Sequence, residues 1–340
     1  MYKRIRKELL LFLLLIMFGT SCSEMRENTT EKEVTVTLKL SGDFNVDVTQ
    51  DPLTKASSND AYGINVYYDK QGDGKTDDVY AYGLFDNIAA MTITLLSGHK
   101  YKFTCALVKD AKNTLFYGQA FGSSYSGYAY PFQTTSSGST PIGNRFIINE
   151  SNIYLSGLGS GEVHLKSISS PSSSNATSYA SVNRFYGETD QYEPVPNGTV
   201  DIFLKRVVFG ARFIVTGVQN GSVTISCSPI FNKTVTSDYY GPETIYSFNN
   251  PYDCWKNETP LSFNVKVDYT SNRGGTLWNL SKTQSVTFRR NIMTTITINL
   301  THDLSDASFV FSEEPFGDEN IITIGINTDG LIDIIVNPND

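Results

Sequence analysis

Four aspartates gather in the stretch YDKQGDGKTDDVY, around two glycines. Carboxylate oxygens on a tight loop are the ligands that Ca²⁺ prefers, so Asp69, Asp73 and Asp77 are candidate calcium ligands. An EF-hand register counted from Asp69 requires Asp or Asn at position 71 and Glu at position 80, where Gln71 and Tyr80 stand. Because the stretch joins two strand-like runs, its aspartates and glycines also fit a hairpin turn. We favour the turn, with calcium binding as the alternative.

A second candidate site is the aromatic run LFYGQAFGSSYSGYAYPF, residues 115–132, in which glycine and serine separate the rings. Three uses fit such a run: stacking on sugar faces, anchoring a protein interface, or covering an open end of a sandwich. Covering the sandwich is the interpretation we favour. The candidate ligand or interface residues are Tyr117, Phe121, Tyr125, Tyr128 and Tyr130.

Catalytic arrangements are poorly supported. The three histidines, His99, His164 and His302, have no partner at metal-ligand spacing, and the sequence contains neither CxxC nor HExxH. The run GETDQYE holds three acidic residues in seven, which does not by itself show a converging pair of carboxylates, and GSSYSG lacks the GxSxG form of a serine nucleophile. We therefore expect no enzyme, no cofactor and no transition-metal site.

The start of the chain has the layout of a secretory signal. Four basic residues precede an apolar run that extends from Leu9 to Phe18, followed by Gly19, Thr20, Ser21 and then Cys22. The run is too short to span a bilayer, which needs about 20 apolar residues. The cleavage region resembles a bacterial lipoprotein box, except that Gly19 stands where the box prefers a large aliphatic residue. We expect residues 1–21 to be removed and Cys22 to be lipidated, with plain secretion as the alternative.

Residues 22–33 predict a flexible tether, because they are polar and charged with Met25 as their one large apolar side chain. Loss of residues 1–21 removes four basic side chains and one acidic one, so the formal charge moves from −8 to about −11. An acidic surface argues against a nucleic-acid partner. Acylation at Cys22 makes the membrane the expected contact.

The other cysteines, Cys105, Cys227 and Cys254, are odd in number, which argues against a disulfide framework. Cys105 and Cys227 lie on the apolar faces of alternating runs. We expect both to be small buried hydrophobes, as free thiols usually are.

The dominant hydrophobic period is two, as in EVTVTLKL, KYKFTCALV and LSFNVKVDY. Turn dipeptides such as Asn220-Gly221 join successive runs as hairpins, and no helix of more than two turns is indicated. This pattern predicts an all-β chain of two tandem antiparallel β-sandwiches. We place the N-terminal sandwich at 34–195 and the C-terminal sandwich at 196–340.

Four stretches carry a family resemblance: LTKASSNDAYGINVYY, YAYGLFDNIAAMTITLLSGHKYKFTCALVKD, VDIFLKRVVFGARFIVTG and VTFRRNIMTTITINL. They resemble the fimbrillin superfamily of Bacteroidota, which includes shaft, tip and lipidated anchor subunits of type V pili. The resemblance implies transthyretin-like sandwiches stacked end to end and export to the outer membrane. In shaft subunits of this family, a protease cuts after an arginine behind the first strand, and a neighbour's strand fills the vacated groove.

The corresponding position in this chain is Lys55, which makes Lys55 the candidate processing site and argues against an arginine-specific cut. An uncut chain keeps its own strand from Val34 to Leu40 and cannot polymerise by strand exchange. We therefore expect a non-enzymatic, lipid-anchored surface protein of the outer membrane, acting in fimbria assembly, anchoring or adhesion. Its expected partners are fimbrial subunits or host or bacterial surface ligands. The alternative is a surface glycan-binding lipoprotein of a polysaccharide-uptake system.

Overall fold

The structure is a computed structural model of the 340-residue chain. The residues that it describes are 32–43, 59–112, 115–119, 125–128, 132–135, 142–148, 151–159, 166–168, 182–219, 221–228, 230–273, 276–300, 307–315, 322–326 and 332–336. No helix among them is long and apolar enough to cross a bilayer.

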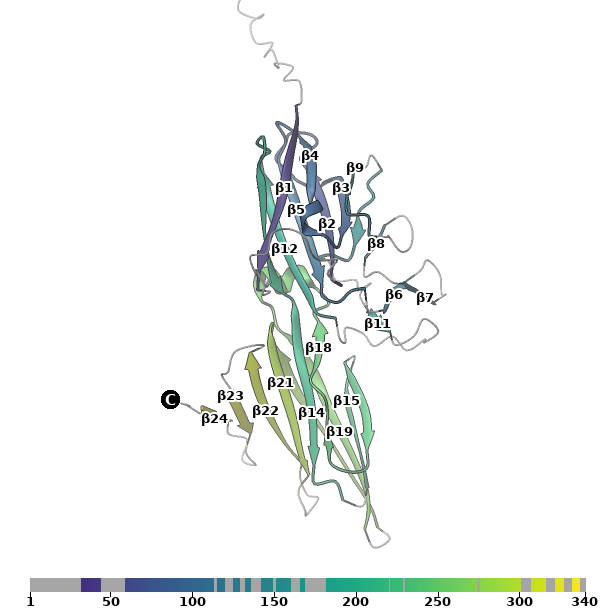
Figure 1. The fold of residues 1–340 in the computed structure, drawn as a ribbon. Coiled ribbons are helices and arrows are strands. Elements are labelled where there is room, and N and C mark those ends of the chain that lie inside the picture. Colours follow the sequence, from purple (N-terminus) through teal and green to yellow (C-terminus); the bar gives the residue numbers. More distant parts are fainter. Residues whose placement is uncertain are drawn as a thin grey trace, which may run out of the picture.

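The N-terminal half is built on one eight-stranded sheet in the order β4-β1-β13-β12-β5-β2-β3-β9 (Figure 1). One hydrophobic cluster unites side chains from both ends of this order, such as Val36, Ile93 and Phe85, so the sheet folds over on itself as a sandwich. The strands are β1 (Glu33–Gly42), β2 (Ala61–Tyr68), β3 (Asp78–Phe85), β4 (Thr92–Leu96), β5 (Tyr101–Val108), β9 (Phe146–Ile148), β12 (Arg184–Tyr192) and β13 (Thr199–Arg206), with a 3-10 turn η1 (Ile88–Ala90) before β4.

Strand β1 shows why the alternating sequence forms a half-buried strand. Val34, Val36 and Leu38 are buried, while the residues between them are exposed, as side chains that alternate across a pleated strand require. The strand pairs antiparallel with β4 and parallel with β13. The sequence predicted antiparallel sandwiches, so the parallel pairing of β1 with β13 departs from that prediction. Its physical basis is that β1 and β13 are joined by the rest of the half, which is long enough for a crossover.

Part of the chain between β5 and β12 packs on the outer face of the first sheet. Phe132, Leu155 and Leu158 are buried and belong to the cluster that also contains Ala106 and Val108 of β5. Besides β9, this stretch of chain contains β6 (Leu115–Gln119), β7 (Tyr125–Tyr128), β8 (Gln133–Thr134), β10 (Leu155–Ser156) and β11 (Lys166–Ile168). They form a three-stranded sheet, β11-β6-β7, and a two-stranded one, β10-β8.

The C-terminal half packs a seven-stranded sheet, β17-β14-β21-β22-β23-β24 with β18 on β14, and a four-stranded sheet, β16-β15-β19-β20 (Figure 1). Phe209, Phe213, Ile225, Val267 and Ile296 from both sheets are buried in one cluster. A second parallel pair, β14 with β21, repeats the pairing of β1 with β13. The strands are β14 (Val208–Thr216), β15 (Gly221–Cys227), β16 (Phe231–Val235), β17 (Tyr239–Tyr240), β18 (Thr244–Ser247), β19 (Leu261–Arg273), β20 (Thr276–Phe288), β21 (Ile292–Leu300), β22 (Ala307–Pro315), β23 (Ile322–Ile326) and β24 (Ile332–Val336).

The described residues contain one α-helix, α2 (Pro251–Asn257), which lies between the two halves of the chain. Pro251 starts it at a position where no backbone donor is needed, and the Asn250 side chain accepts a hydrogen bond from the backbone N–H of Asp253 at 3.1 Å. It ends at Glu258, which has a left-handed backbone with φ 53°. The all-β prediction of two sandwiches is confirmed, with this short helix added.

The chain changes from one sheet to the other at Val207, which is fully buried. The strand 199–206, expected to open the second sandwich, pairs instead with β1 and β12 in the first. The boundary between 195 and 196 is therefore replaced by one at Val207. The run TVDIFLKRVVFGARFIVTGV reads as one long strand, and only tertiary pairing divides it into β13 and β14.

Candidate functional site

A groove lies between the outer face of the first sheet and α2. Its main hollow has a volume of about 500 Å³, and an adjoining hollow of about 430 Å³ shares Lys102, Glu188 and Tyr252 with it. The main hollow falls within the range of about 300–1,000 Å³ that is typical of small-molecule sites. Six residues of three neighbouring strands form its floor: Asn65, Tyr67, Lys102, Thr104, Tyr186 and Glu188.

Strand register brings the floor residues together. Asn65 of β2 pairs with Thr104 of β5, and Thr104 pairs with Glu188 of β12. Tyr67 pairs with Lys102 in the next row. Residues at paired positions of neighbouring strands project from the same face of a sheet, so amide, hydroxyl and carboxylate groups form one row.

The first wall of the groove is the segment 154–159, which two buried polar side chains hold in place. The Asn65 amide donates to the carbonyl of Leu155 at 2.9 Å and accepts from the Leu155 N–H at 2.8 Å. The Arg184 guanidinium, 2% exposed, donates to the carbonyls of Gly157 and Leu158. Buried polar groups with such partners fix one geometry, because losing a partner costs about 1–3 kcal/mol.

The opposite wall is α2, which carries Tyr252 and Trp255. The Tyr252 N–H donates to the carbonyl of Gly159 at 3.1 Å, so the two walls meet at one end of the groove. A Cβ at position 159 would overlap the Tyr186 hydroxyl, which explains the glycine.

Aromatic rings stand on both sides of the floor. The ring centroids of Tyr67 and Tyr154 are 6.4 Å apart on the side of the first wall. On the side of α2, the Trp255 ring lies 6.0 Å from that of Tyr186 and 6.1 Å from that of Tyr252. These separations are typical of interacting aromatic pairs.

The charges on the floor are paired. Lys102 Nζ lies 3.1 Å from Glu188 Oε2, and the Tyr186 hydroxyl donates to the other oxygen of Glu188. Burial raises the pKa of Tyr67 to about 12 and the pKa of Tyr186 well above its usual value. Both phenols therefore stay neutral at physiological pH, and the hydroxyl hydrogen of Tyr186 is the one that it donates to Glu188.

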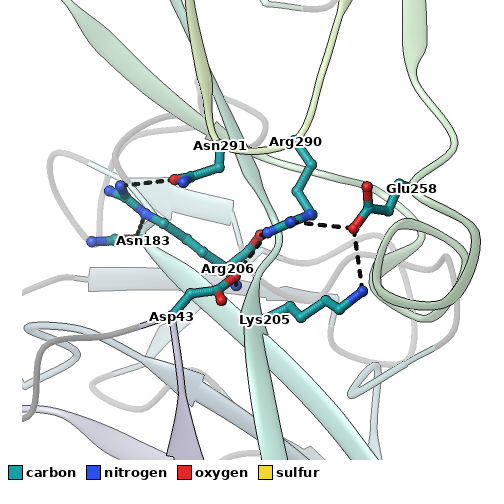
Figure 2. A network of polar contacts seen from close by, with 7 residues as sticks. All are labelled: Asp43, Asn183, Lys205, Arg206, Glu258, Arg290 and Asn291. Carbon is teal, nitrogen blue, oxygen red and sulfur yellow. Dashed lines mark hydrogen bonds and ion pairs between the residues drawn. The ribbon is translucent and has the colours of Figure 1, made fainter. Parts of the chain in front are cut away.

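Helix α2 is held against the first half by an ion-pair network at its C-terminal end (Figure 2). Glu258 Oε1 lies 3.2 Å from Lys205 of β13 and 3.2 Å from Arg290 of the β20–β21 turn. Arg290 also contacts Asp43, the residue after β1, at 2.8 Å. Hydrogen bonding to Lys205 and the charge of Arg290 lower the pKa of Glu258. We call this network of Glu258, Lys205, Arg290 and Asp43 the joint, and it connects β1, β13 and α2.

Arg206, the last residue of β13, adds a branch to the same network in which the guanidinium has uncharged partners (Figure 2). Its Nε donates to the Asn183 side chain at 2.9 Å, and its Nη1 donates to that of Asn291 at 3.3 Å. The two asparagines precede β12 and β21 respectively. Arg206 thus links strands of both sandwiches.

The candidate calcium ligands have separate roles in the structure. Asp69 Oδ1 accepts from the backbone N–H of Lys100 at 2.7 Å, and Asp73 pairs with Lys75 at 2.9 Å. Asp77 lies at the rim of the groove. Strands β2 and β3 pair on either side of these residues, so they form a hairpin connection. Within the described part of the chain, no three acidic, histidine or cysteine side chains are placed to hold a metal ion.

The aromatic run is described in part. Tyr117 lies in β6, and Tyr125 and Tyr128 lie in β7, which pairs with β6 so that Tyr125 faces Gln119 and Tyr128 faces Phe116 in register. Phe121 and Tyr130 lie outside the described residues. A ligand or interface role for these five residues stays a prediction.

Cys22, residues 22–31 of the expected tether and Lys55 lie outside the described residues, so lipidation and processing stay predictions. Glu33, the last residue of the expected tether, is the first residue of β1. Cys105, Cys227 and Cys254 are free and buried. The expectation that Cys105 and Cys227 are small buried hydrophobes is confirmed.

Sequence reasoning missed the groove because its parts come from distant segments. Tyr67, Tyr154 and Trp255 meet only through the sheet, the first wall and α2. One signal was available: Asn65 and Thr104 are polar residues within otherwise apolar strand runs. Buried polar side chains of this kind need partners, and Asn65 has its partner in Leu155 of the first wall.

No known family matches the sequence, and no curated protein matches it. Solved structures similar to this chain include a fimbrial assembly protein from Parabacteroides distasonis, 12% identical with a TM-score of 0.31, covering 86% of this chain and 98% of that one. Another is the fimbrial anchor protein Mfa2 from Porphyromonas gingivalis, 11% identical with a TM-score of 0.25, covering 84% of this chain and 78% of that one. Scores this low establish neither fold nor function, so the proposals below rest on the chain itself.

Proposed function

We propose that this chain is a non-enzymatic, lipid-anchored protein of the outer membrane surface that acts in fimbria assembly, anchoring or adhesion. The observation that carries the proposal is the position of β1, which is paired on both sides, by β4 and by β13. Val36 and Leu38 are 0% and 2% exposed, so β1 supplies core side chains as well as backbone pairing. Because β1 fills its place between β4 and β13, a neighbour's strand cannot enter the sandwich at that position.

The direction of the chain supports an anchoring role. Strand β1 begins at the end of the molecule far from the β19–β20 hairpin (Figure 1). The predicted lipid on Cys22 precedes β1 by a tether that spans at most about 40 Å when fully extended. A protein tethered in this way presents its second sandwich away from the bilayer, where fimbrial subunits or surface ligands are available.

Metabolic labelling with a clickable palmitate tests the anchor. We expect the native chain to incorporate the label and to fractionate with the outer membrane, and Cys22→Ala to lose both properties. Cys254→Ala is the matched control, because that thiol is buried in the fold and its loss leaves the anchor intact. A native chain that stays unlabelled contradicts lipidation.

The N-terminus of protein extracted from cells tests the retained strand. A start at Cys22 supports the anchor-like role, since β1 then remains in its sheet. A start at Ala56, directly after Lys55, contradicts it, because β1 would have been separated from the folded chain.

A further inference from the structure

We propose that the groove between the first sheet and α2 binds a neutral oligosaccharide. The site consists of the polar floor row, the Tyr67 and Tyr154 rings on one side, and the Tyr252 and Trp255 rings on the other. The inference gives the adhesion part of the proposed function a ligand class, and it rests on the groove alone, independently of the lipid anchor.

The chemistry of the lining matches that of a pyranose ring. A sugar ring has apolar C–H faces and a rim of hydroxyl groups, so its site needs flat apolar surfaces together with polar groups in the plane of the ring. The groove supplies aromatic faces on both sides and, between them, the Thr104 hydroxyl, the Glu188 carboxylate and the Lys102 ammonium. Tyr67 adds a neutral phenol group.

The charges argue for a neutral ligand. Lys102 is paired with Glu188 at 3.1 Å. Asp77 lines the first hollow, and Asp190 lines the second together with Lys205 and Lys256, so both signs of charge are present. A phosphate or sulfate group would be repelled by the carboxylates in the groove and by the net charge of the chain, which is formally −8. A fatty acyl chain would bury the floor's polar groups without hydrogen bonds, which is costly.

The shape indicates a chain of sugars. The two hollows share Lys102, Glu188 and Tyr252, so they form one continuous groove that passes along α2. An extended oligosaccharide can contact both hollows, with Tyr154 lining the first and Trp255 lining the second.

The walls are fixed before any ligand binds. Asn65 and Arg184 hold the first wall, and Glu258 holds α2 through Lys205 and Arg290. Preorganised sites bind more tightly because less conformational entropy is lost on binding.

Affinity electrophoresis of the mature chain, in a detergent without a sugar headgroup, tests the proposal. The gels contain mannan, xylan, β-glucan, galactan or, as a charged comparison, polygalacturonate. We expect at least one neutral polysaccharide to retard the native chain, and Tyr154→Ala and Tyr252→Ala each to weaken that retardation about tenfold. The matched control is Tyr240→Ala, a tyrosine that is 65% exposed and belongs to β17 of the second sandwich. It should migrate like the native chain.

Three outcomes overturn the inference. They are no retardation by any neutral polysaccharide, retardation that Tyr154→Ala leaves equal to that of Tyr240→Ala, and stronger retardation by polygalacturonate than by every neutral polymer. Thermal melting of each variant shows whether it is folded, and Tyr154, being 36% exposed, is the variant expected to leave the core unaffected. Failure of this test leaves the palmitate result unchanged, so the two proposals fail separately.

Discussion

Asn65 and Arg184 show how single buried polar side chains shape the groove. Each is 2% exposed, and each forms hydrogen bonds with backbone groups of the wall segment 154–159. Burial lowers the pKa of Arg184 to about 10, which still leaves it charged at neutral pH. The wall is therefore held by a charged donor, the Arg184 guanidinium, that is bonded to two backbone carbonyls of the wall.

The buried thiols give a prediction about reactivity. Burial raises the pKa of Cys227 and of Cys254 to about 12 and raises the pKa of Cys105 still further, so almost no thiolate forms near neutral pH. We expect no reaction with Ellman's reagent at a pH of about 8 in the native chain. In concentrated guanidinium chloride, the three thiols should react while an acylated Cys22 does not. Rapid reaction of any native thiol contradicts the burial.

Strand β1 matters to stability as much as to the proposed role. Leu38 lies in the core, and Lys39 beside it is exposed. The same strand ends at Gly42, whose backbone lies so close to Leu204 of β13 that a side chain would overlap its carbonyl. The first strand is thus built into the sandwich along its length.

Leu38→Ala tests this contribution. We expect it to lower the free energy of unfolding by about 2–5 kcal/mol, because it removes buried methyl groups and leaves a cavity. Lys39→Ala, the neighbouring exposed position, should change it by less than about 0.5 kcal/mol. Urea titration measures both. Equal values for the two variants would mean that β1 is not packed as described.

The interface between the sandwiches combines a continuous apolar cluster with the polar network of Figure 2. Val207 and Phe209 belong to the same cluster as Tyr186 of the first half. The polar network surrounds this contact and orients α2 through Glu258. The arrangement fixes how the two sandwiches stack, and with it the width of the groove.

The network predicts a pH dependence. Because the folded-state pKa of Glu258 lies below the usual 4.5, its stabilising effect is present above that pH and is lost as the pH falls through the lowered value. The side chain is 55% exposed, so solvent screening keeps the effect below about 1 kcal/mol. We expect Glu258→Gln to be less stable than the native chain near neutral pH and equally stable in strong acid, by urea titration.

Glu193→Gln is the matched control for the joint. Its carboxylate is 72% exposed and lies 3.9 Å from Lys100, away from the network. The difference in the free energy of unfolding between the native chain and this variant should stay close to zero at both pH values. If Glu258→Gln remains less stable than the native chain in strong acid, the stabilising effect of Glu258 comes from packing and not from its charge.

Strand alternation made the fold class accessible from the sequence. In β1 and β19 the period of two follows directly from burial of one strand face, and it predicted strands at those positions. In β5 the pattern also predicted a strand, although the structure buries both of its faces. The parallel pairs could not be predicted in this way, since a strand's own pattern does not indicate the direction of its neighbour. The groove was equally inaccessible, because Tyr67, Tyr154 and Trp255 share no sequence motif.

The sequence alone determined that this chain is all-β, carries a signal-like start followed by a cysteine, and buries Cys105 and Cys227. These are local properties, set by the periodicity and polarity of short segments. Tertiary structure decided the break at Val207, the parallel pairing of β1 with β13, and the aromatic groove beside α2. Each of these depends on which distant segments share hydrogen bonds and buried surface, and that is a property of the assembled sheets.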